Sequence, residues 1–152
     1  METQHRFGSL FIAAKEDASK KLLEKVGLRP TRQRVSICAL LFTGEARHVA
    51  VESLHSEAKA HGFVMSVSTV YNVLRQFEEA GLVRRIAVPG AMGVYDVNVG
   101  DHQHFFIPDE HRIIDMPPDS VSLEDLPEPP EGYCIDKVDV VVHLKRLPAK
   151  DG

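Results

Sequence analysis

The sequence predicts an α+β protein in which a helical N-terminal part is followed by a shorter part built mainly from strands. Three observations favour this class. Apolar residues recur at helical spacing up to about residue 80, short apolar runs and alternation replace that spacing afterwards, and prolines crowd residues 117–130. The 152 residues, 43% of them apolar, allow one domain or two small ones. We expect two, at residues 1–94 and residues 95–152.

The first domain is expected to begin with four helices. Thr31 and Ser68 are placed as N-caps, because their hydroxyls can accept a hydrogen bond from the first helical turn. Gly27, Gly62 and Gly81 follow the apolar stretches and favour helix ends. The four predicted ranges are residues 16–26, 31–43, 50–61 and 68–80.

The fourth helix is the most informative, because its two faces differ in chemistry. Val70, Val73, Leu74 and Phe77 fall at i, i+3, i+4 and i+7 and predict a face that packs on a core. The opposite face has no acidic residue, and each of its side chains can donate a hydrogen bond to a base or a phosphate. That face comprises Thr69, Tyr71, Asn72, Arg75 and Gln76.

Residues 82–88 and 94–97 flank a Pro-Gly-Ala-Met-Gly segment and predict a β-hairpin, with Arg84 and Arg85 in its first strand. Several short helices followed by a basic hairpin are typical of a winged helix-turn-helix. In that arrangement one helix enters the major groove of DNA and the hairpin contacts the backbone or the minor groove. A plain helical bundle with Tyr71 as a surface aromatic is the alternative.

The charge distribution supports the nucleic-acid interpretation. Residues 1–90 carry 13 Lys and Arg against 9 Asp and Glu, whereas residues 91–152 carry 5 against 13. A basic first part suits a polyanion, while an acidic second part suits cations, contacts with itself or simple solvation. We therefore expect contacts with double-stranded DNA from Arg29, Arg32, Arg34, Ser68, Thr69, Tyr71, Asn72, Arg75, Arg84 and Arg85.

The second domain is predicted to contain short strands at residues 102–107 and 111–116, a helical turn near residues 122–126 and a last strand at residues 133–146. The apolar face of this last strand comprises Val138, Val140, Val142 and Leu144. A unit of about 50 residues without a disulfide cannot bury an adequate core alone. We therefore expect a second copy of the chain to complete it in a homodimer.

Three histidines and two carboxylates are placed so that they can meet. His102 and His104 lie two residues apart in a predicted strand, so both imidazoles point to one side, and Asp115 lies in the next strand. Asp96 ends the hairpin, and His48 lies in the loop before the third helix. This donor set suits Fe²⁺, Mn²⁺ or Zn²⁺. Taken singly, each histidine is explained as well by an ordinary surface or cross-strand role.

Catalytic signatures are absent from the sequence. It has no G-x-S-x-G, H-E-x-x-H, Walker or G-x-G-x-x-G motif, and Cys38 and Cys134 are interpreted as structural. A small non-haem iron enzyme using His102, His104 and Asp115 is the alternative from another class, but it needs a larger barrel than this chain supplies. With no apolar run long enough to span a bilayer and no signal peptide, we expect a cytoplasmic protein that is not an enzyme.

Five segments resemble the ferric uptake regulator (Fur) superfamily of metal-responsive regulators. They are GLRPTRQR at 27–34, RHVAVESLH at 47–55, STVYNVLRQFEEAGLVRR at 68–85, VYDV at 94–97 and HQHFF at 102–106. The resemblance implies a homodimer whose winged-helix domains bind palindromic operator DNA and whose second domains dimerise and sense metal. It also implies that the family's sensing site, between the two domains, falls on His48, Asp96, His102, His104 and Asp115.

The departures from the family pattern point to one branch. Most members hold a structural zinc with two C-x-x-C pairs, whereas Ile107 and Glu110 stand at the first pair's positions and the C-terminal segment has no cysteine. Loss of that zinc, together with the H-Q-H segment, resembles the iron response regulator (Irr) branch, which controls iron uptake and haem synthesis. The resemblance therefore implies an iron- or haem-responsive repressor without the structural zinc that cysteines hold in most members. His102 and His104 are its candidate haem ligands, and a peroxide- or manganese-sensing repressor is the alternative.

Overall fold

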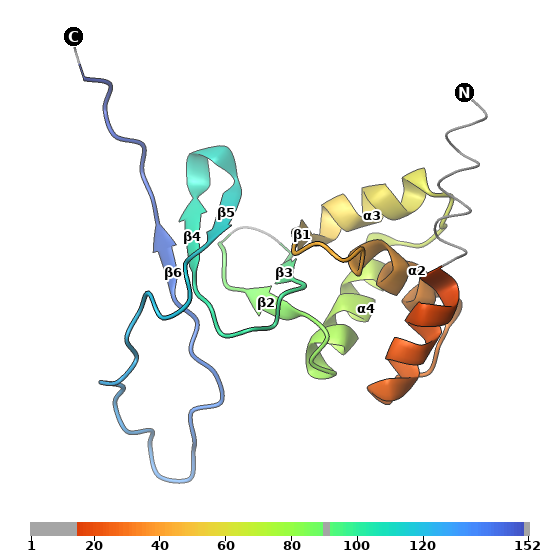
Figure 1. Ribbon diagram of the computed structural model, residues 1–152, viewed down its shortest axis with the longest axis horizontal. Helices are drawn as coiled ribbons and strands as arrows, with labels where there is room; N and C mark the ends of the chain where they lie inside the picture. The colour runs from red at the N-terminus through yellow and green to blue at the C-terminus, as the bar shows by residue number, and fades with distance from the viewer. Residues whose placement is uncertain (1–14, 90–91, 151–152) are drawn as a thin grey trace. The chain divides into compact units, whose positions relative to one another are not determined.

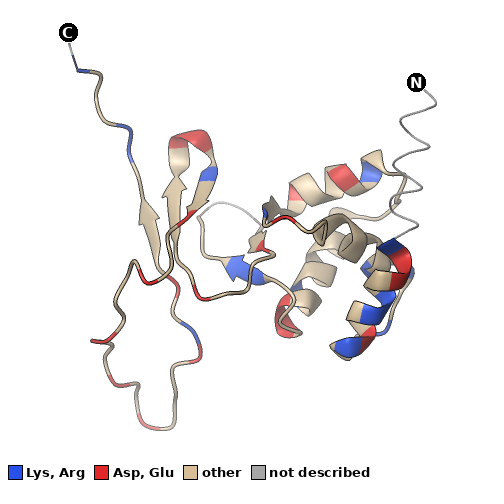
Figure 2. Cartoon of the chain, viewed as in Figure 1, with Lys and Arg blue, Asp and Glu red and all other residues tan. Residues whose placement is uncertain are grey.

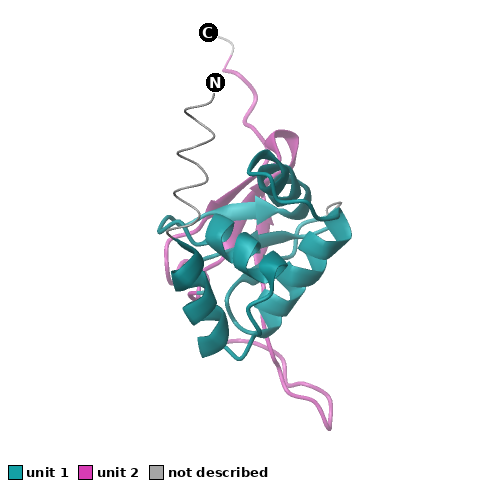
Figure 3. Ribbon diagram, turned by 90° about the vertical axis from the view of Figure 1, so that its right-hand side faces the viewer, with its two compact units in different colours: residues 1–99 teal, residues 100–152 magenta. Residues whose placement is uncertain are grey.

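The computed structural model describes residues 15–89 and 92–150 (Figure 1). The chain divides into two compact units, residues 1–99 and residues 100–152 (Figure 3). The boundary expected between residues 94 and 95 lies inside strand β3 (Val94–Asp96). All of this strand therefore belongs to the same compact unit as the helices.

The described part of the first unit contains four helices, as predicted. Residues 15–25 are helical, and α2 (Arg32–Leu41), α3 (Val51–Ala60) and α4 (Val67–Glu79) follow. Thr31 caps α2 as expected, because its hydroxyl accepts a hydrogen bond from the Arg34 amide at 3.3 Å. Within the described residues no helix is both long enough and apolar enough to span a membrane.

The N-cap of α4 is Ser66, so the prediction of Ser68 is wrong. The Ser66 hydroxyl accepts a hydrogen bond from the Thr69 amide at 3.1 Å. Two serines compete at this helix start, and the earlier one reaches an amide that has no partner inside the helix, which leaves Ser68 in the first turn. The predicted apolar face is confirmed, since α4 buries Val70, Val73, Leu74 and Phe77.

The described strands of the first unit form an antiparallel sheet in the order β1-β3-β2. β2 (Arg84–Ile86) pairs with β3 in the predicted hairpin. The sequence did not predict β1 (His48–Ala50), which places His48 in a strand rather than in a loop. A strand of three residues is too short to show a period of two, and it forms here because β3 supplies its hydrogen bonds.

The core of the first unit joins side chains from all of its described helices and from its sheet. Its fully buried members include Leu23, Leu41, Leu54, Phe77 and Tyr95. Cys38 lies in the same core, as predicted, and burial raises the pKa of its thiol. Cys38 therefore acts as a small apolar residue rather than as a nucleophile.

The described strands of the second unit form a sheet in the order β5-β4-β6. β4 (His104–Ile107) pairs antiparallel with β5 (Arg112–Asp115) across the 3-10 turn η1 (Pro108–Glu110), which confirms the predicted hairpin. β6 (Val141–His143) lies parallel to β4 on its other side. His102 lies before β4 and not inside the strand, as the sequence had suggested.

The C-terminal region departs from the prediction. The strand expected at residues 133–146 is limited to β6, because β4 is short and pairs with only three of its residues. Residues 122–126 contain a turn rather than a helix, and Cys134 is exposed rather than structural. Val142 and Leu144 are 38% and 36% exposed, so their predicted apolar face is not covered within one chain.

We predict that Gly93 does not tolerate a side chain. Its φ is +156°, and a Cβ at this position would lie 2.9 Å from Cε2 of the buried Tyr95 ring. Gly93→Ala should therefore lower the free energy of unfolding by about 1–3 kcal/mol, as overpacked cores do, in urea denaturation at fixed protein concentration. Gly132→Ala is the control, because φ at Gly132 is also positive at +87° while a Cβ there meets nothing within 4 Å. An equal loss in both variants would contradict this packing argument.

Candidate metal centre and nucleic-acid interface

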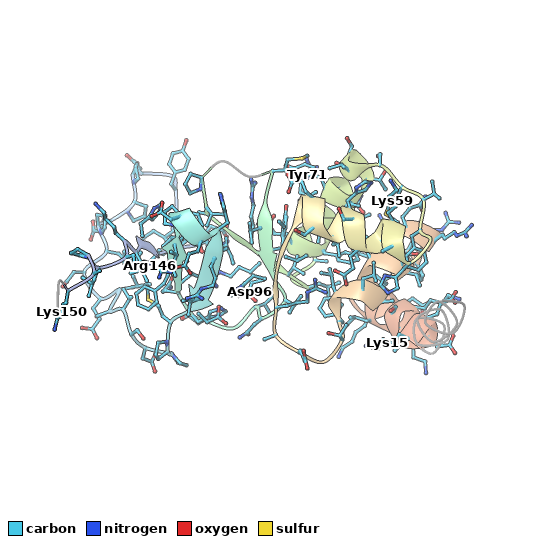
Figure 4. The ribbon with its side chains drawn as sticks, turned by 90° about the horizontal axis from the view of Figure 1, so that it is seen from above. Lys15, Lys59, Tyr71, Asp96, Arg146 and Lys150 are labelled. Carbon is cyan, nitrogen blue, oxygen red and sulfur yellow. The ribbon has the colours of Figure 1, made fainter. Side chains whose placement is uncertain are left out.

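One imidazole and one carboxylate face each other in the sheet of the first unit. The register of β1 against β3 pairs His48 with Asp96, and His48 Nε2 lies 3.2 Å from Asp96 Oδ2. The Asp96 side chain is fully buried at the end of β3 (Figure 4), whereas that of His48 is 21% exposed. The Asn98 amide donates a hydrogen bond to Asp96 Oδ1 at 2.8 Å. A buried carboxylate needs such partners, and these two fix its orientation.

Two imidazoles converge on one carboxylate oxygen in the second unit. Nε2 of His102 and Nε2 of His104 lie 3.3 and 3.2 Å from Asp115 Oδ1. Both rings are buried, with 7% and 3% of each residue exposed, and their centroids lie 4.6 Å apart in an edge-on arrangement. The register of β4 against β5, which places His104 opposite Asp115, explains this convergence. The prediction that His102 and His104 point to one side holds although only His104 is in the strand.

The hydrogen bond of His102 gives a test of whether these residues fit a metal ion. Nδ1 of His102 donates a hydrogen bond to the Gly100 carbonyl at 2.8 Å, because a carbonyl oxygen can only accept. In the neutral ring, Nε2 is then an acceptor that faces the Asp115 carboxylate, which is also an acceptor. A cation between them, either a proton or a metal ion, resolves this contact, and a second hydrogen bond at Nδ1 is typical of histidines that bind metals. The donor set therefore fits a divalent ion.

Gln103, between the two histidines, has a different function. Its side chain is buried, and its Oε1 accepts a hydrogen bond from the Val140 amide at 2.8 Å. Its backbone carbonyl accepts another from the Met116 amide at 2.8 Å. Gln103 therefore connects the segment before β6 to the hairpin of the second unit. Sequence reasoning missed this role, because its partner lies 37 residues away.

The face of α4 that was predicted to contact DNA is polar, and two of its residues are exposed to solvent. Asn72 and Arg75 are exposed, whereas Tyr71 (labelled in Figure 4) is half-buried because it packs against the core. Nε of Arg75 lies 3.6 Å from Glu79 Oε1, four residues later on the same helix. Exposed pairs of this kind contribute little free energy, so Arg75 can exchange this partner for a phosphate or a base.

Arg34 and Gln76 form an intramolecular contact that the sequence did not predict. Nε of Arg34 donates to Gln76 Oε1 at 3.0 Å, and one terminal nitrogen of Arg34 donates to the Arg29 carbonyl at 2.9 Å. The guanidinium thereby joins the start of α2 to α4 across 42 residues of sequence. Of the other predicted phosphate contacts, Arg29, Arg32 and Arg85 are exposed and Arg84 is half-buried. In Figure 2, β2 is coloured blue because it contains Arg84 and Arg85.

Comparison with known proteins places this arrangement in a family. Residues 25–133 match the ferric uptake regulator family. The chain belongs to this family. The ferric uptake regulation protein of Pseudomonas aeruginosa is 36% identical over 95 residues, which cover 62% of this chain and 71% of that protein. The corresponding protein of Klebsiella pneumoniae is 32% identical over 102 residues, 66% of each chain.

Solved structures agree with this assignment. The ferric uptake regulator of Pseudomonas aeruginosa with manganese has a TM-score of 0.62 at 26% identity, covering 84% of this chain and 97% of that one. The Vibrio cholerae ferric uptake regulator has a TM-score of 0.64 at 23% identity, covering 84% and 98%, and shows the shared fold. The α+β class with a winged-helix first domain is thus confirmed. Members of the family are metal-responsive transcription regulators rather than enzymes.

Proposed function

We propose that this chain is an iron- or haem-responsive repressor of the iron response regulator branch. It acts as a homodimer on palindromic operators of genes for iron homeostasis and haem biosynthesis. The observation that carries the proposal is the pair of half-sites: His48 with Asp96 in the first unit, and His102 and His104 with Asp115 in the second. Within each half-site the ligand atoms lie within 4.8 Å of one another.

The two half-sites hold a single divalent ion in this proposal. Asp96 and His102 are separated by five residues, so the chain between them can span at most about 20 Å. Three imidazole nitrogens and two carboxylate oxygens without sulfur suit Fe²⁺ or Mn²⁺, with Zn²⁺ as a further ion that such a set binds. The bound ion supplies positive charge that satisfies the two carboxylates. The residues orient their ligand atoms through the Asn98 amide and the Gly100 carbonyl.

Ligands on two units connect sensing to DNA recognition. His48 and Asp96 belong to the sheet whose other strand, β2, carries Arg84 and Arg85. Five ligands drawn from both units would fix the angle between them. In a dimer, this angle sets whether the two α4 helices match half-sites about 34–36 Å apart, which is one turn of DNA.

The cysteines support the choice of branch. The chain has two, and Cys38 is buried in α2 while Cys134 is exposed in the second unit. One chain therefore cannot supply the two C-x-x-C pairs of a structural zinc site.

An imidazole that serves as an axial ligand of haem iron is no longer available to a divalent ion, so haem and metal compete for His102 and His104.

A peroxide- or manganese-sensing repressor is the second candidate. It is favoured by the same sulfur-free donor set, which suits Mn²⁺. It is also supported by the structure of the Pseudomonas aeruginosa ferric uptake regulator, which was solved with manganese. The two candidates differ in their response to haem.

The first prediction of the proposed function concerns the metal. We expect one Mn²⁺ per chain in calorimetric titration. His48→Ala and His104→Ala should each weaken Mn²⁺ binding by about 10- to 100-fold or more, because loss of a residue that only supports a ligand already weakens metal binding by that factor. His111→Asn is the matched control, because it removes an exposed imidazole at a φ of +46° that Asn tolerates. If His104→Ala weakens Mn²⁺ binding and His48→Ala does not, the two half-sites do not share one ion.

The second prediction concerns DNA. Arg75→Ala should cost about 1–3 kcal/mol of operator binding and relax specificity, whereas Arg85→Ala should weaken all sequences alike and lower the salt slope by about one. Fluorescence anisotropy with operator and scrambled duplexes over a salt series measures both. Lys145→Ala, at an exposed position of the second unit, is the control. If Arg75→Ala and Tyr71→Ala leave operator affinity unchanged, α4 is not the recognition helix.

The third prediction separates the two candidate functions. Haem should change operator affinity of the wild-type dimer, and the double variant His102→Ala, His104→Ala should lose this response while remaining a dimer by light scattering. His143→Ala, at an exposed position in β6, should behave as wild type. An unaltered Soret band and titration midpoint in the double variant would contradict haem ligation by these residues. No haem response in the wild type would favour the peroxide or manganese sensor.

A further inference from the structure

We propose that the ion pair between Arg47 and Glu57 is the positioning element that carries the state of the His48–Asp96 half-site to α4. The proposal rests on the proposed function, because it assumes that a metal ion changes DNA affinity. It concerns the first unit alone. Neither residue is among the expected metal or DNA contacts.

Arg47 forms hydrogen bonds with three parts of the first unit. Its two terminal nitrogens bind the two carboxylate oxygens of Glu57, on α3, at 3.1 and 2.8 Å. One of these nitrogens also donates to the Leu40 carbonyl in α2 at 3.3 Å. The Arg47 carbonyl accepts a hydrogen bond from the Val97 amide at 3.2 Å. Arg47 therefore joins α2, α3 and the strand pair.

The backbone bond of Arg47 lies directly beside the half-site. Arg47 precedes His48, and Val97 follows Asp96, so the bond between Arg47 and Val97 closes the ladder immediately outside the two ligands. A change in the separation of His48 and Asp96 must therefore move the Arg47 backbone. The guanidinium at the other end of this residue is held by Glu57.

A further contact continues from α3 to α4. His55, two residues before Glu57 on α3, donates from Nε2 to the Met65 carbonyl at 2.9 Å. Met65 directly precedes Ser66, the N-cap of α4. Displacement of α3 through Glu57 is thus passed to the first turn of the predicted recognition helix.

The geometry of this pair differs from that of the exposed pair between Arg146 and Glu110. It is bidentate, and each side chain is 30% exposed, so it is partly shielded from solvent. Glu57 raises the pKa of Arg47, and a planar guanidinium matches both oxygens of a carboxylate in a way that an ammonium cannot. By contrast, Glu110 pairs with Arg146 through a single oxygen, and the Arg146 side chain is 81% exposed. The Glu110 pair therefore serves as a matched control.

The test measures coupling, defined as the ratio of operator affinities of the dimer with and without saturating Mn²⁺. Glu57→Gln keeps the shape of the side chain but removes its charge, and it should reduce this ratio at least fivefold. Arg47→Lys keeps the charge but loses the bidentate contact, and should reduce the ratio less. Glu110→Gln should leave it unchanged. Thermal unfolding of each variant verifies that the protein is folded. Because coupling is reciprocal, operator DNA must also change the Mn²⁺ affinity of the dimer by this ratio, so a variant that reduces the one effect must reduce the other by the same factor.

A double-mutant cycle shows whether the pair acts as a unit. Arg47→Gln combined with Glu57→Gln should reduce the ratio no further than Glu57→Gln alone, since one partner has no function without the other. Wild-type coupling in folded Glu57→Gln, or additive losses in the double variant, would overturn the proposal. A wild-type dimer whose operator affinity does not respond to Mn²⁺ would instead overturn the metal-responsive function on which the proposal rests, and this inference with it.

Discussion

The pairing of β1 with β3 is the interaction on which the proposed sensor depends. It places His48 opposite Asp96 and leaves the Asp96 carboxylate fully buried. A buried carboxylate is costly unless it is paired and hydrogen-bonded, and His48 and the Asn98 amide provide those partners. Because little water screens this site, a cation bound here interacts strongly with the strand pair. Two of the five proposed ligands, His48 and Asp96, therefore lie in the unit that also carries α4.

The second unit has a different physical problem, which is its size. Its described sheet has short strands, and Val142 and Leu144 remain more than a third exposed. With two cysteines and no C-x-x-C pair, one chain cannot supply four cysteine ligands to a zinc ion. A second copy of the chain or a bound ligand would stabilise such a unit, because each binds the folded state and shifts its equilibrium. In the proposed homodimer, assembly and ligand binding are therefore expected to support each other.

Sequence reasoning succeeded where structure is local and failed where it depends on distant partners. Thr31, the glycines and the apolar stripe of α4 act within a few residues, so the helices could be predicted. β1 and the length of β6 depend on which strand lies alongside, and no pattern in three residues records that. The displaced N-cap of α4 reflects a choice between two nearby serines, which sequence alone does not rank.

The candidate site divides in the same way. The five proposed ligands follow from the family resemblance and from the chemistry of their side chains, and each half-site brings its members together. The supporting contacts could not be predicted, because Arg34 meets Gln76 and Gln103 meets Val140 across 42 and 37 residues. Even Arg47 and Glu57, ten residues apart, required a strand between them that the sequence does not indicate.

The hydrogen bond at His102 Nδ1 determines which ring nitrogen is available to a cation at Asp115. With Nδ1 committed to the Gly100 carbonyl, Nε2 of the neutral ring and the Asp115 oxygen meet as two acceptors 3.3 Å apart. A proton or a divalent cation between these two atoms makes the contact favourable. A ligand shifts a conformational equilibrium only by the difference in its affinity for the two states. In the proposed function, a divalent ion that binds ligands of both units favours the conformation in which the two half-sites are close. It does so by as much as its affinity for that conformation exceeds its affinity for the separated one.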